Sequence, residues 1–379
     1  MPTSSLEKMM CIKGRAGVSL LIAVGSITTS LADNVRFIAL GDWGGQGHYP
    51  YFTEAQAETS DGMARVAGGR DGAPAAEFVL SLGDNFYHRG LEGGEDGLKR
   101  FESTYESIYH QKELDIPWMV IAGNHDHCGT IDQQLELSSD HPRWNFPDYN
   151  HIVTREFSTE NGDNMKMVII MIDTIHLAGV HCPHPHHEDE LLVEEDYRPP
   201  PGHDPEDSES LNRADMTLRW IEEALSKSSD ADYLLVAGHY PIYSACSHGS
   251  TPHLIRDLDP LLRKYKVTAY LSGHEHCQFH FEHEEMNYIL TGNGQSCCYA
   301  DRNRDRLPRG GDLKYILVDD VEYSGTSGVR GGFASFEAAA NGLSVYMHRE
   351  NGDVLYKTTL PPRTRVDPVF GDAVVTAKE

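Results

Sequence analysis

Short apolar runs alternate with segments of helical periodicity along most of the chain. From their β-branched and aromatic content we predict buried strands at 35–40, 77–82, 118–122, 167–172, 233–237 and 267–271. Apolar residues recur at helical spacing in the segments 98–110, 212–226 and 254–265. Strands that alternate with helices indicate an α/β fold with a layered core in which most strands are buried.

Two segments depart from this alternation. Strands predicted at 333–337, 343–348 and 354–358 are joined by Asn-Gly pairs, which are typical hairpin turns, so we expect a small antiparallel meander. Residues 181–210 follow no period and contain five His, ten acidic residues and a Pro-Pro-Pro-Gly run, which predicts an exposed loop. The histidines of this loop are candidate metal ligands, but a solvated acidic excursion is the favoured interpretation, because nothing fixes their spacing on a helix or strand.

The first 32 residues have the pattern of a removable export signal. Basic residues precede an apolar stretch at 16–27, and Ser30-Leu31-Ala32 supplies the small residues that signal peptidase requires. A membrane anchor is the weaker alternative, because this stretch is shorter than the roughly 20 residues of a membrane span. We therefore expect a secreted protein, or one of an acidic secretory compartment, with no membrane attachment after signal removal.

Charge and cysteine content limit the possible partners. The chain has 32 Lys+Arg against 58 Asp+Glu, a formal net charge of −26, which argues against nucleic acid as a partner. Outside the signal, an even number of cysteines favours disulfides, although six allow 15 pairings: Cys128, Cys182, Cys246, Cys277, Cys297 and Cys298. No Cys-x-x-Cys pair is present, so a thiolate zinc site is not expected.

The candidate chemistry lies at the ends of the predicted strands. Five strands run into a glycine followed by Asp, Asn or His, in the motifs Gly41-Asp42, Gly83-Asp84, Gly123-Asn124, Gly238-His239 and Gly273-His274-Glu275-His276. One such turn alone is usually only a turn or a hydrogen-bonded loop residue. Because the carboxyl ends of strands in open α/β sheets meet at one crevice, five together predict a common site.

The number of oxygen and nitrogen donors suggests two metal ions rather than one. Asp84 is the best candidate for a bridging carboxylate, and Tyr87 lies one turn after it. His274 and His276 are two residues apart, so an extended backbone would aim both to the same side, with each serving a different ion.

These motifs, in this order, resemble the metallophosphoesterase superfamily. More narrowly, the chain resembles the tartrate-resistant, mammalian-type purple acid phosphatases over about residues 35–362. The narrower resemblance rests on Gly41-Asp42-Trp43-Gly44-Gly45, Ser81-Leu82-Gly83-Asp84-Asn85-Phe86-Tyr87, Ala122-Gly123-Asn124-His125-Asp126-His127, Arg143-Trp144-Asn145-Phe146-Pro147, Gly238-His239-Tyr240-Pro241 and Gly332-Phe333-Ala334. It implies a four-layer sandwich of two mixed β-sheets flanked by helices, with one catalytic domain at 33–362 and a tail at 363–379.

The resemblance also implies the metal ligands. A ferric ion and a divalent ion, Fe(II), Zn(II) or Mn(II), would share Asp84 as a bridge. The ferric ion would be held by Asp42, Tyr87 and His276, and the divalent ion by Asn124, His239 and His274. Phenolate and carboxylate suit Fe(III), while imidazole and amide suit the divalent ion. Tyr87 distinguishes the purple acid phosphatases from many other two-metal phosphoesterases, because a tyrosinate bound to Fe(III) gives the family its colour. The alternative role for Tyr87 is that of an aromatic residue that packs beside Phe86.

The implied activity is that of a secreted acid phosphatase. It would hydrolyse small phosphate monoesters with a metal-bound hydroxide as the nucleophile, and we expect it to be a monomer. His125 and His248 would hydrogen-bond a phosphate oxygen or the leaving group; for His248 the alternative is a surface histidine. Two other functions stay open: a phosphodiesterase or nucleotide hydrolase of the same superfamily, and a non-catalytic iron-binding or redox protein.

The loop 181–210 lies where the mammalian-type enzymes carry an exposed loop that restrains activity until it is cut. Here it is longer and rich in acidic residues and histidine. Our hypothesis is that it hangs over the crevice and competes with anionic substrates. A bond between Cys182, at its start, and Cys246 would tie the loop to the active site.

Overall fold

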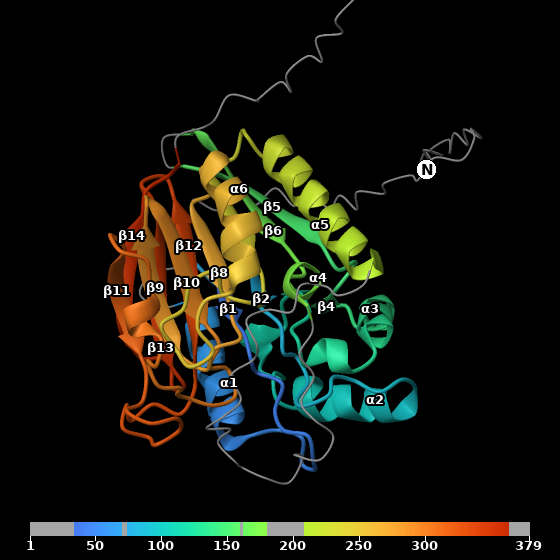
Figure 1. Cartoon of the computed structure of the whole chain (residues 1–379). Helices are drawn as coiled ribbons and strands as arrows, with labels where there is room; N and C mark the ends of the chain where they lie inside the picture. Colours follow the sequence, from blue (N-terminus) through green and yellow to red (C-terminus); the bar gives the residue numbers. More distant parts are fainter. Residues whose placement is uncertain (1–33, 70–73, 160–161, 180–207, 364–379) are drawn as a thin grey trace, which may run out of the picture.

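The computed structural model describes residues 34–69, 74–159, 162–179 and 208–363. Two seven-stranded mixed sheets pack face to face in this part of the chain, and helices cover the outer side of each (Figure 1). The predicted α/β fold with four layers is therefore confirmed. The signal at 1–32 and almost all of the tail at 363–379 lie outside the described residues.

The first sheet joins the N-terminal strands to the C-terminal meander. Its strands follow the order β14 (Val354–Leu360), β13 (Gly342–Arg349), β12 (Gly332–Ala339), β1 (Val35–Leu40), β2 (Phe78–Ser81), β3 (Trp118–Val120) and β4 (Trp144–Asn145). Neighbours from β1 to β4 are parallel, whereas β1 pairs with β12 in antiparallel register. The three C-terminal strands form the predicted antiparallel meander.

The second sheet is built from the middle of the chain. Its strands follow the order β11 (Asp312–Leu317), β9 (Gln278–His283), β10 (Met286–Thr291), β8 (Ala269–Ser272), β7 (Tyr233–Ala237), β6 (Asn164–Met171) and β5 (His151–Ser158). Strands β6, β7, β8 and β10 are parallel neighbours, so their carboxyl ends lie at the same edge.

The helices divide between the two outer faces (Figure 1). The outer side of the first sheet is covered by α1 (Glu54–Ala67), α2 (Glu95–Phe101), the π-helical turn Glu102–Glu106 and α3 (Ile131–Asp140). The outer side of the second sheet is covered by α4 (Ile175–Ala178), α5 (Ser208–Lys227), the π-helical turn Leu254–Leu258 and α6 (Asp259–Lys264). The predicted loop 181–210 ends earlier than expected, since α5 begins at Ser208; its residues 181–207 lie outside the described ones.

Side chains of the central strands alternate between two apolar layers. In β1, Phe37 and Ala39 pack between the sheets, whereas Ile38 and Leu40 pack under the helices of the first sheet. Burial on both faces explains why these strands appear in the sequence as continuous apolar runs. No helix in the described ranges is long and apolar enough to cross a membrane.

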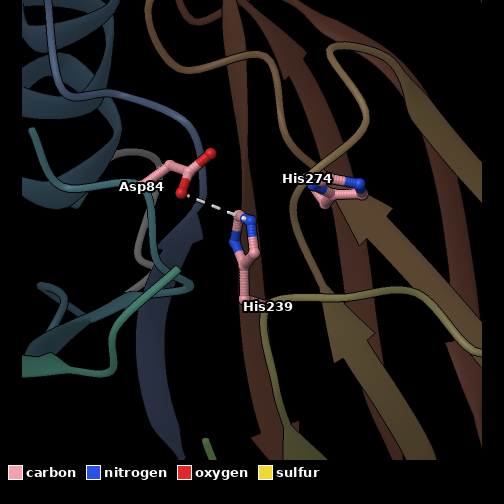
Figure 2. A group of neighbouring side chains, drawn as sticks. All are labelled: Asp84, His239 and His274. Carbon is pink, nitrogen blue, oxygen red and sulfur yellow. Dashed lines mark ion pairs between the residues drawn. The ribbon is translucent and has the colours of Figure 1, made fainter. Parts of the chain in front are cut away.

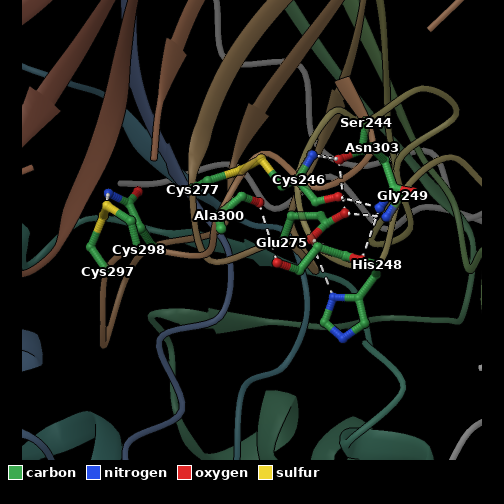
Figure 3. Close-up of a disulfide and its surroundings, with 12 residues drawn as sticks. Ser244, Cys246, His248, Gly249, Glu275, Cys277, Cys297, Cys298, Ala300 and Asn303 are labelled. Atoms are coloured by element: carbon green, nitrogen blue, oxygen red, sulfur yellow. Dashed lines mark hydrogen bonds and ion pairs between the residues drawn. A yellow bond between two sulfur atoms is a disulfide. The ribbon is translucent and has the colours of Figure 1, made fainter. Parts of the chain in front are cut away.

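The disulfide expected between Cys182 and Cys246 is wrong. Cys246 is bonded to Cys277, which follows His276, so this bridge ties the loop after β7 to the loop after β8 (Figure 3). Cys297 and Cys298 are bonded to each other, and Cys128 is also disulfide-bonded.

Candidate metal centre

The five strand ends singled out in the sequence meet at one place. Strands β1, β2 and β3 end beside β7 and β8 of the opposite sheet, and the loops after them carry Asp42, Asp84, Asn124, His239 and His274. Figure 2 shows Asp84 from the first sheet facing His239 and His274 from the second. Side chains that are far apart in the chain thus gather in one largely buried cluster where the two sheets meet.

Glycines at the strand ends let the backbone approach these side chains closely. A Cβ on Gly123 would lie 2.2 Å from Asp84 Oδ1, and a Cβ on Gly273 would lie 2.6 Å from Asp42 Oδ2. Asp42 and Asp84 themselves have left-handed backbones, with φ of 58° and 53°. Such strain in non-glycine residues costs free energy and is typical of functional sites.

The first group of donors gathers around the Tyr87 hydroxyl. Its Oη lies 2.9 Å from Asp42 Oδ1, 2.9 Å from His276 Nε2 and 3.1 Å from Asp84 Oδ2. His276 Nε2 and Asp42 Oδ1 are 3.5 Å apart. Two carboxylates, a phenol and an imidazole therefore point their donor atoms at one small volume.

The second group lies on the other side of Asp84. His239 Nε2 is 3.0 Å from Asn124 Oδ1 and 3.4 Å from Asp84 Oδ1. Donor atoms of Asp84, His239 and His274 all lie within 4.8 Å of one another. Because Asp84 directs Oδ2 to the first group and Oδ1 to the second, its carboxylate is placed to bridge two cations.

The extended backbone expected between His274 and His276 is wrong. His274 has φ of 70°, so the segment is not extended. The left-handed turn brings the His274 ring to the second group, 5.2 Å from the His239 ring centroid, while the His276 ring lies in the first group. Each imidazole therefore belongs to a different group of donors, and a turn rather than strand alternation separates them.

Burial and mutual repulsion control protonation in this pocket. Burial raises the pKa of Asp42 well above its ordinary value, although the His239 imidazole opposes this. Burial also tends to raise the pKa of Asp84, but the nearby imidazoles of His239 and His125 outweigh burial, so the pKa of Asp84 is lowered. The pKa of the Tyr87 phenol is raised by burial and by the two carboxylates. A cation among these oxygens would offset both burial and repulsion.

The histidines are held in the form that binds metal. Burial lowers the pKa of His276 to about 3 and that of His274 well below its usual value, so both rings are neutral. The second nitrogen of two rings is fixed by a hydrogen bond: His239 Nδ1 to Leu82 O at 2.9 Å, and His276 Nδ1 to Ser296 Oγ at 3.0 Å. Such outer bonds orient metal-binding imidazoles.

The two predicted substrate-facing histidines are partly exposed and lie beside the two donor groups. The His125 side chain is 19% exposed, its ring lies 4.5 Å from the Tyr87 ring, and its backbone N–H donates to Asp84 Oδ1 at 2.9 Å. The His248 side chain is 27% exposed, and its ring lies 4.5 Å from that of His274. His248 is therefore not a remote surface histidine.

Sequence reasoning missed Glu275, which is completely buried. Its carboxylate accepts hydrogen bonds from the backbone N–H groups of His248 and Gly249, at 3.1 and 2.7 Å, and from Ser244 Oγ at 2.8 Å (Figure 3). It also contacts His248 Nδ1 at 3.2 Å. Burial lowers the pKa of His248, but this bond and the Glu275 charge outweigh burial and raise it.

Two tyrosines near His276 were also missed. The Tyr299 ring stacks on the His276 ring with centroids 4.7 Å apart, and the Tyr323 hydroxyl bonds His276 Nδ1. Both lie in irregular segments after β10, where no strand-end motif marks them. No local signal in the sequence could have found them.

Comparison with known proteins identifies the family. Residues 35–278 match the calcineurin-like phosphoesterase family. Tartrate-resistant acid phosphatase type 5 of Homo sapiens is 35% identical over 353 residues, which cover 92% of this chain and 98% of that protein. The chain belongs to the purple acid phosphatase family. Purple acid phosphatase 3 of Arabidopsis thaliana is a more distant relative, 28% identical over 85% of this chain and 76% of that one.

Solved structures agree on the fold. The GAP50 anchor of the inner membrane complex of Plasmodium superposes with a TM-score of 0.67 at 21% identity, covering 89% of this chain and 93% of that one. A purple acid phosphatase from yellow lupin seeds superposes with a TM-score of 0.54 at 15% identity, covering 88% of this chain and 54% of that one. Family membership makes the protein a metal-binding phosphoesterase, with the pocket between the two sheets as its candidate metal centre.

Proposed function

We propose that the protein is a secreted acid phosphatase that hydrolyses phosphate monoesters at a dinuclear Fe(III)–M(II) centre. The observation that supports this most is the split donor set. A phenol oxygen lies within 3.1 Å of two carboxylates and an imidazole, and an amide and two imidazoles gather on the other side of the shared carboxylate.

The donor types favour one metal assignment. Asp42, Tyr87 and His276 would hold Fe(III), because a hard trivalent ion prefers phenolate and carboxylate oxygen. The second group would hold Fe(II), Zn(II) or Mn(II) through Asn124, His239 and His274. Asp84 would bridge the ions with its two oxygens, each of which already faces one group.

The remaining residues bind substrate and move protons. When bound, the two cations would neutralise phosphate oxygens and acidify the attacking water. The His125 ring lies against the Tyr87 ring of the first group and the His248 ring against the His274 ring of the second, so each is close to one of the two proposed metal sites, and both would contact the bound phosphate. The raised pKa of His248 keeps its imidazole protonated at acidic pH, which suits donation of a proton to the departing alkoxide.

Family relatives and the predicted signal support the cellular setting. The named relatives are acid phosphatases, and the segment 1–32 is typical of an export signal. We infer an acidic secretory or extracellular compartment, a small phosphate ester as the substrate and a monomeric enzyme.

A visible spectrum combined with metal analysis and turnover tests this proposal. We expect a purple protein with two metal ions per chain, at least one of them iron, and faster turnover of a phosphate monoester than of a phosphodiester. A colourless, iron-free protein would refute the Fe(III)–tyrosinate assignment. A preference for the diester would favour a phosphodiesterase, and full metal loading without turnover would favour a non-catalytic metal protein.

A further inference from the structure

A second cluster of metal-binding residue types lies beside the proposed centre. It consists of His127, in the short 3-10 turn Asp126–Cys128, Asp173, which follows β6, and His176 in α4. One donor atom of each lies within 4.8 Å of the others. None of the three residues has a part in the dinuclear centre described above.

The carboxylate of this cluster is buried and rigidly oriented. Asp173 is fully buried, and its Oδ1 accepts the backbone N–H groups of Ile175, at 2.9 Å, and His176, at 3.1 Å. Its Oδ2 faces His127 Nε2 at 2.7 Å. One oxygen is thus held by the backbone while the other is turned toward an imidazole, which is the arrangement that outer hydrogen bonds give to a metal-binding carboxylate.

The second imidazole is available for a ligand. His176 forms no hydrogen bond through its ring nitrogens to any residue in the described ranges, and its ring centroid lies 5.4 Å from that of His127. Tyr149 packs against it with a ring-centroid distance of 4.7 Å, which limits the rotation of the imidazole. Burial lowers the pKa of His176, so the ring is neutral near pH 7 and can donate a lone pair.

We propose that His127, Asp173 and His176 bind a Zn²⁺ ion that is separate from the dinuclear centre. Two imidazoles and one carboxylate are a common zinc donor set, with water or an anion in the fourth position. Tetrahedral donors about 2.0 Å from zinc lie about 3.3 Å apart. The His127–Asp173 contact, at 2.7 Å, must therefore open by about 0.6 Å. The His176 donor atom lies within 4.8 Å of the other two, so it must move inward by up to about 1.5 Å.

The charges around the cluster favour an anion as the fourth ligand of the proposed zinc ion. Asp173 supplies one negative charge, and Asp148 adds another near His176, whereas Arg213 places a positive charge near both imidazoles. The complex would carry a formal charge of about +1, so its open position would favour an anion such as inorganic phosphate.

The segment that carries Asp173 and His176 is also joined to the proposed dinuclear centre, because Thr174 Oγ1 accepts the backbone N–H of Tyr240, next to His239.

Counting zinc in matched variants tests the proposal. The purified full-length protein, with its own metals in place, would be incubated with ZnCl₂ at pH 7, passed through a desalting column and analysed by mass spectrometry of metals. The His176→Ala variant removes one ligand and leaves the His127–Asp173 contact intact. The control, His110→Ala, removes an exposed imidazole that bonds only its own helix end, at Ser107 O.

We expect wild type and His110→Ala to retain one zinc more per chain than His176→Ala, because loss of a direct ligand weakens binding more than the roughly 10- to 100-fold that loss of a ligand's hydrogen-bond partner causes. The visible spectrum should be equal in all three, because the dinuclear centre is untouched. Equal zinc counts would overturn the proposal. Should His176→Ala fail to fold, anomalous diffraction at the zinc edge from wild-type crystals soaked in ZnCl₂ decides, and no peak between the three side chains would refute it.

Discussion

Replacement of Glu275 by Gln tests whether the buried carboxylate supports His248 as a proton donor. The carboxylate accepts two backbone N–H groups and one hydroxyl and contacts the His248 imidazole. Gln keeps the shape but removes the charge, and its amide NH₂ cannot accept a hydrogen bond. A hydrogen bond to a charged group contributes about 1.5–3 kcal/mol, so its loss corresponds to about 10- to 150-fold in kcat/KM.

The sign of the pH effect follows from the Glu275 charge. Because that charge raises the pKa of His248, its removal lowers this pKa, and the imidazolium fraction falls at any given pH. The alkaline limb of the kcat/KM profile should therefore move to lower pH. The loss should be large for an alkyl phosphate, whose leaving group needs a proton, and small for 4-nitrophenyl phosphate, whose phenolate leaves without one.

The assay is a pH profile of kcat/KM for both substrates in wild type and Glu275→Gln. Glu350→Gln is the matched control, because Glu350 is also a buried carboxylate that accepts a backbone N–H, from Arg330, but it belongs to the turn after β13. An equal loss for both substrates with an unmoved alkaline limb would show that Glu275 only supports the loop. No loss at all would refute the reasoning.

Three further predictions concern colour and stability. Tyr87→Phe should abolish the visible band while iron remains measurable, and a retained band would exclude Tyr87 as the chromophore. Burial lowers the pKa of His348 to about 4, so the unfolded state binds more protons below pH 6.5. The free energy of unfolding should therefore fall by about 1 kcal/mol more in wild type than in His348→Gln between pH 7.5 and 5.5, measured by urea denaturation; parallel curves would contradict this. The double change Cys246→Ser and Cys277→Ser opens a loop of 31 residues and should cost about 3–4 kcal/mol in the same measurement, whereas a loss below about 1 kcal/mol would show that the bridge adds little.

Most strands buried on both faces could be predicted, as could the amphipathic helices with a clear hydrophobic period, whereas elements without such a period or an Asn-Gly turn were missed. Helix α1 was missed because its buried side is made mainly of small and polar residues, with Met63 its one large buried side chain, so no hydrophobic period marks it. The hairpin of β9 and β10 was missed because its turn uses Glu284 and Glu285 at φ of 50° and 66°, where Asn-Gly is the usual signal. In both cases tertiary packing overrides local preference.

The same distinction applies to the candidate site. Residues directly after a buried strand could be placed from the sequence, because strand direction and sheet order bring them to one edge. Glu275 lies in one of those motifs, yet its partners come from the loop at 244–249, whose path depends on the Cys246–Cys277 bridge and the packing around it. The sequence contains these residues but not the loop conformation that joins them.

Net charge was a poor guide to the ligand. The chain carries a formal charge of −26, which suggests repulsion of an anionic substrate, yet surface charges are screened beyond about 8–10 Å at physiological salt. Within the proposed centre, Asp42, Asp84 and an ionised Tyr87 supply three negative charges, and one trivalent and one divalent cation supply five positive charges. The pocket would therefore carry about +2 where the phosphate binds. Because field strength at short range decides binding, the residues at five strand ends outweigh the excess of acidic groups over the rest of the chain.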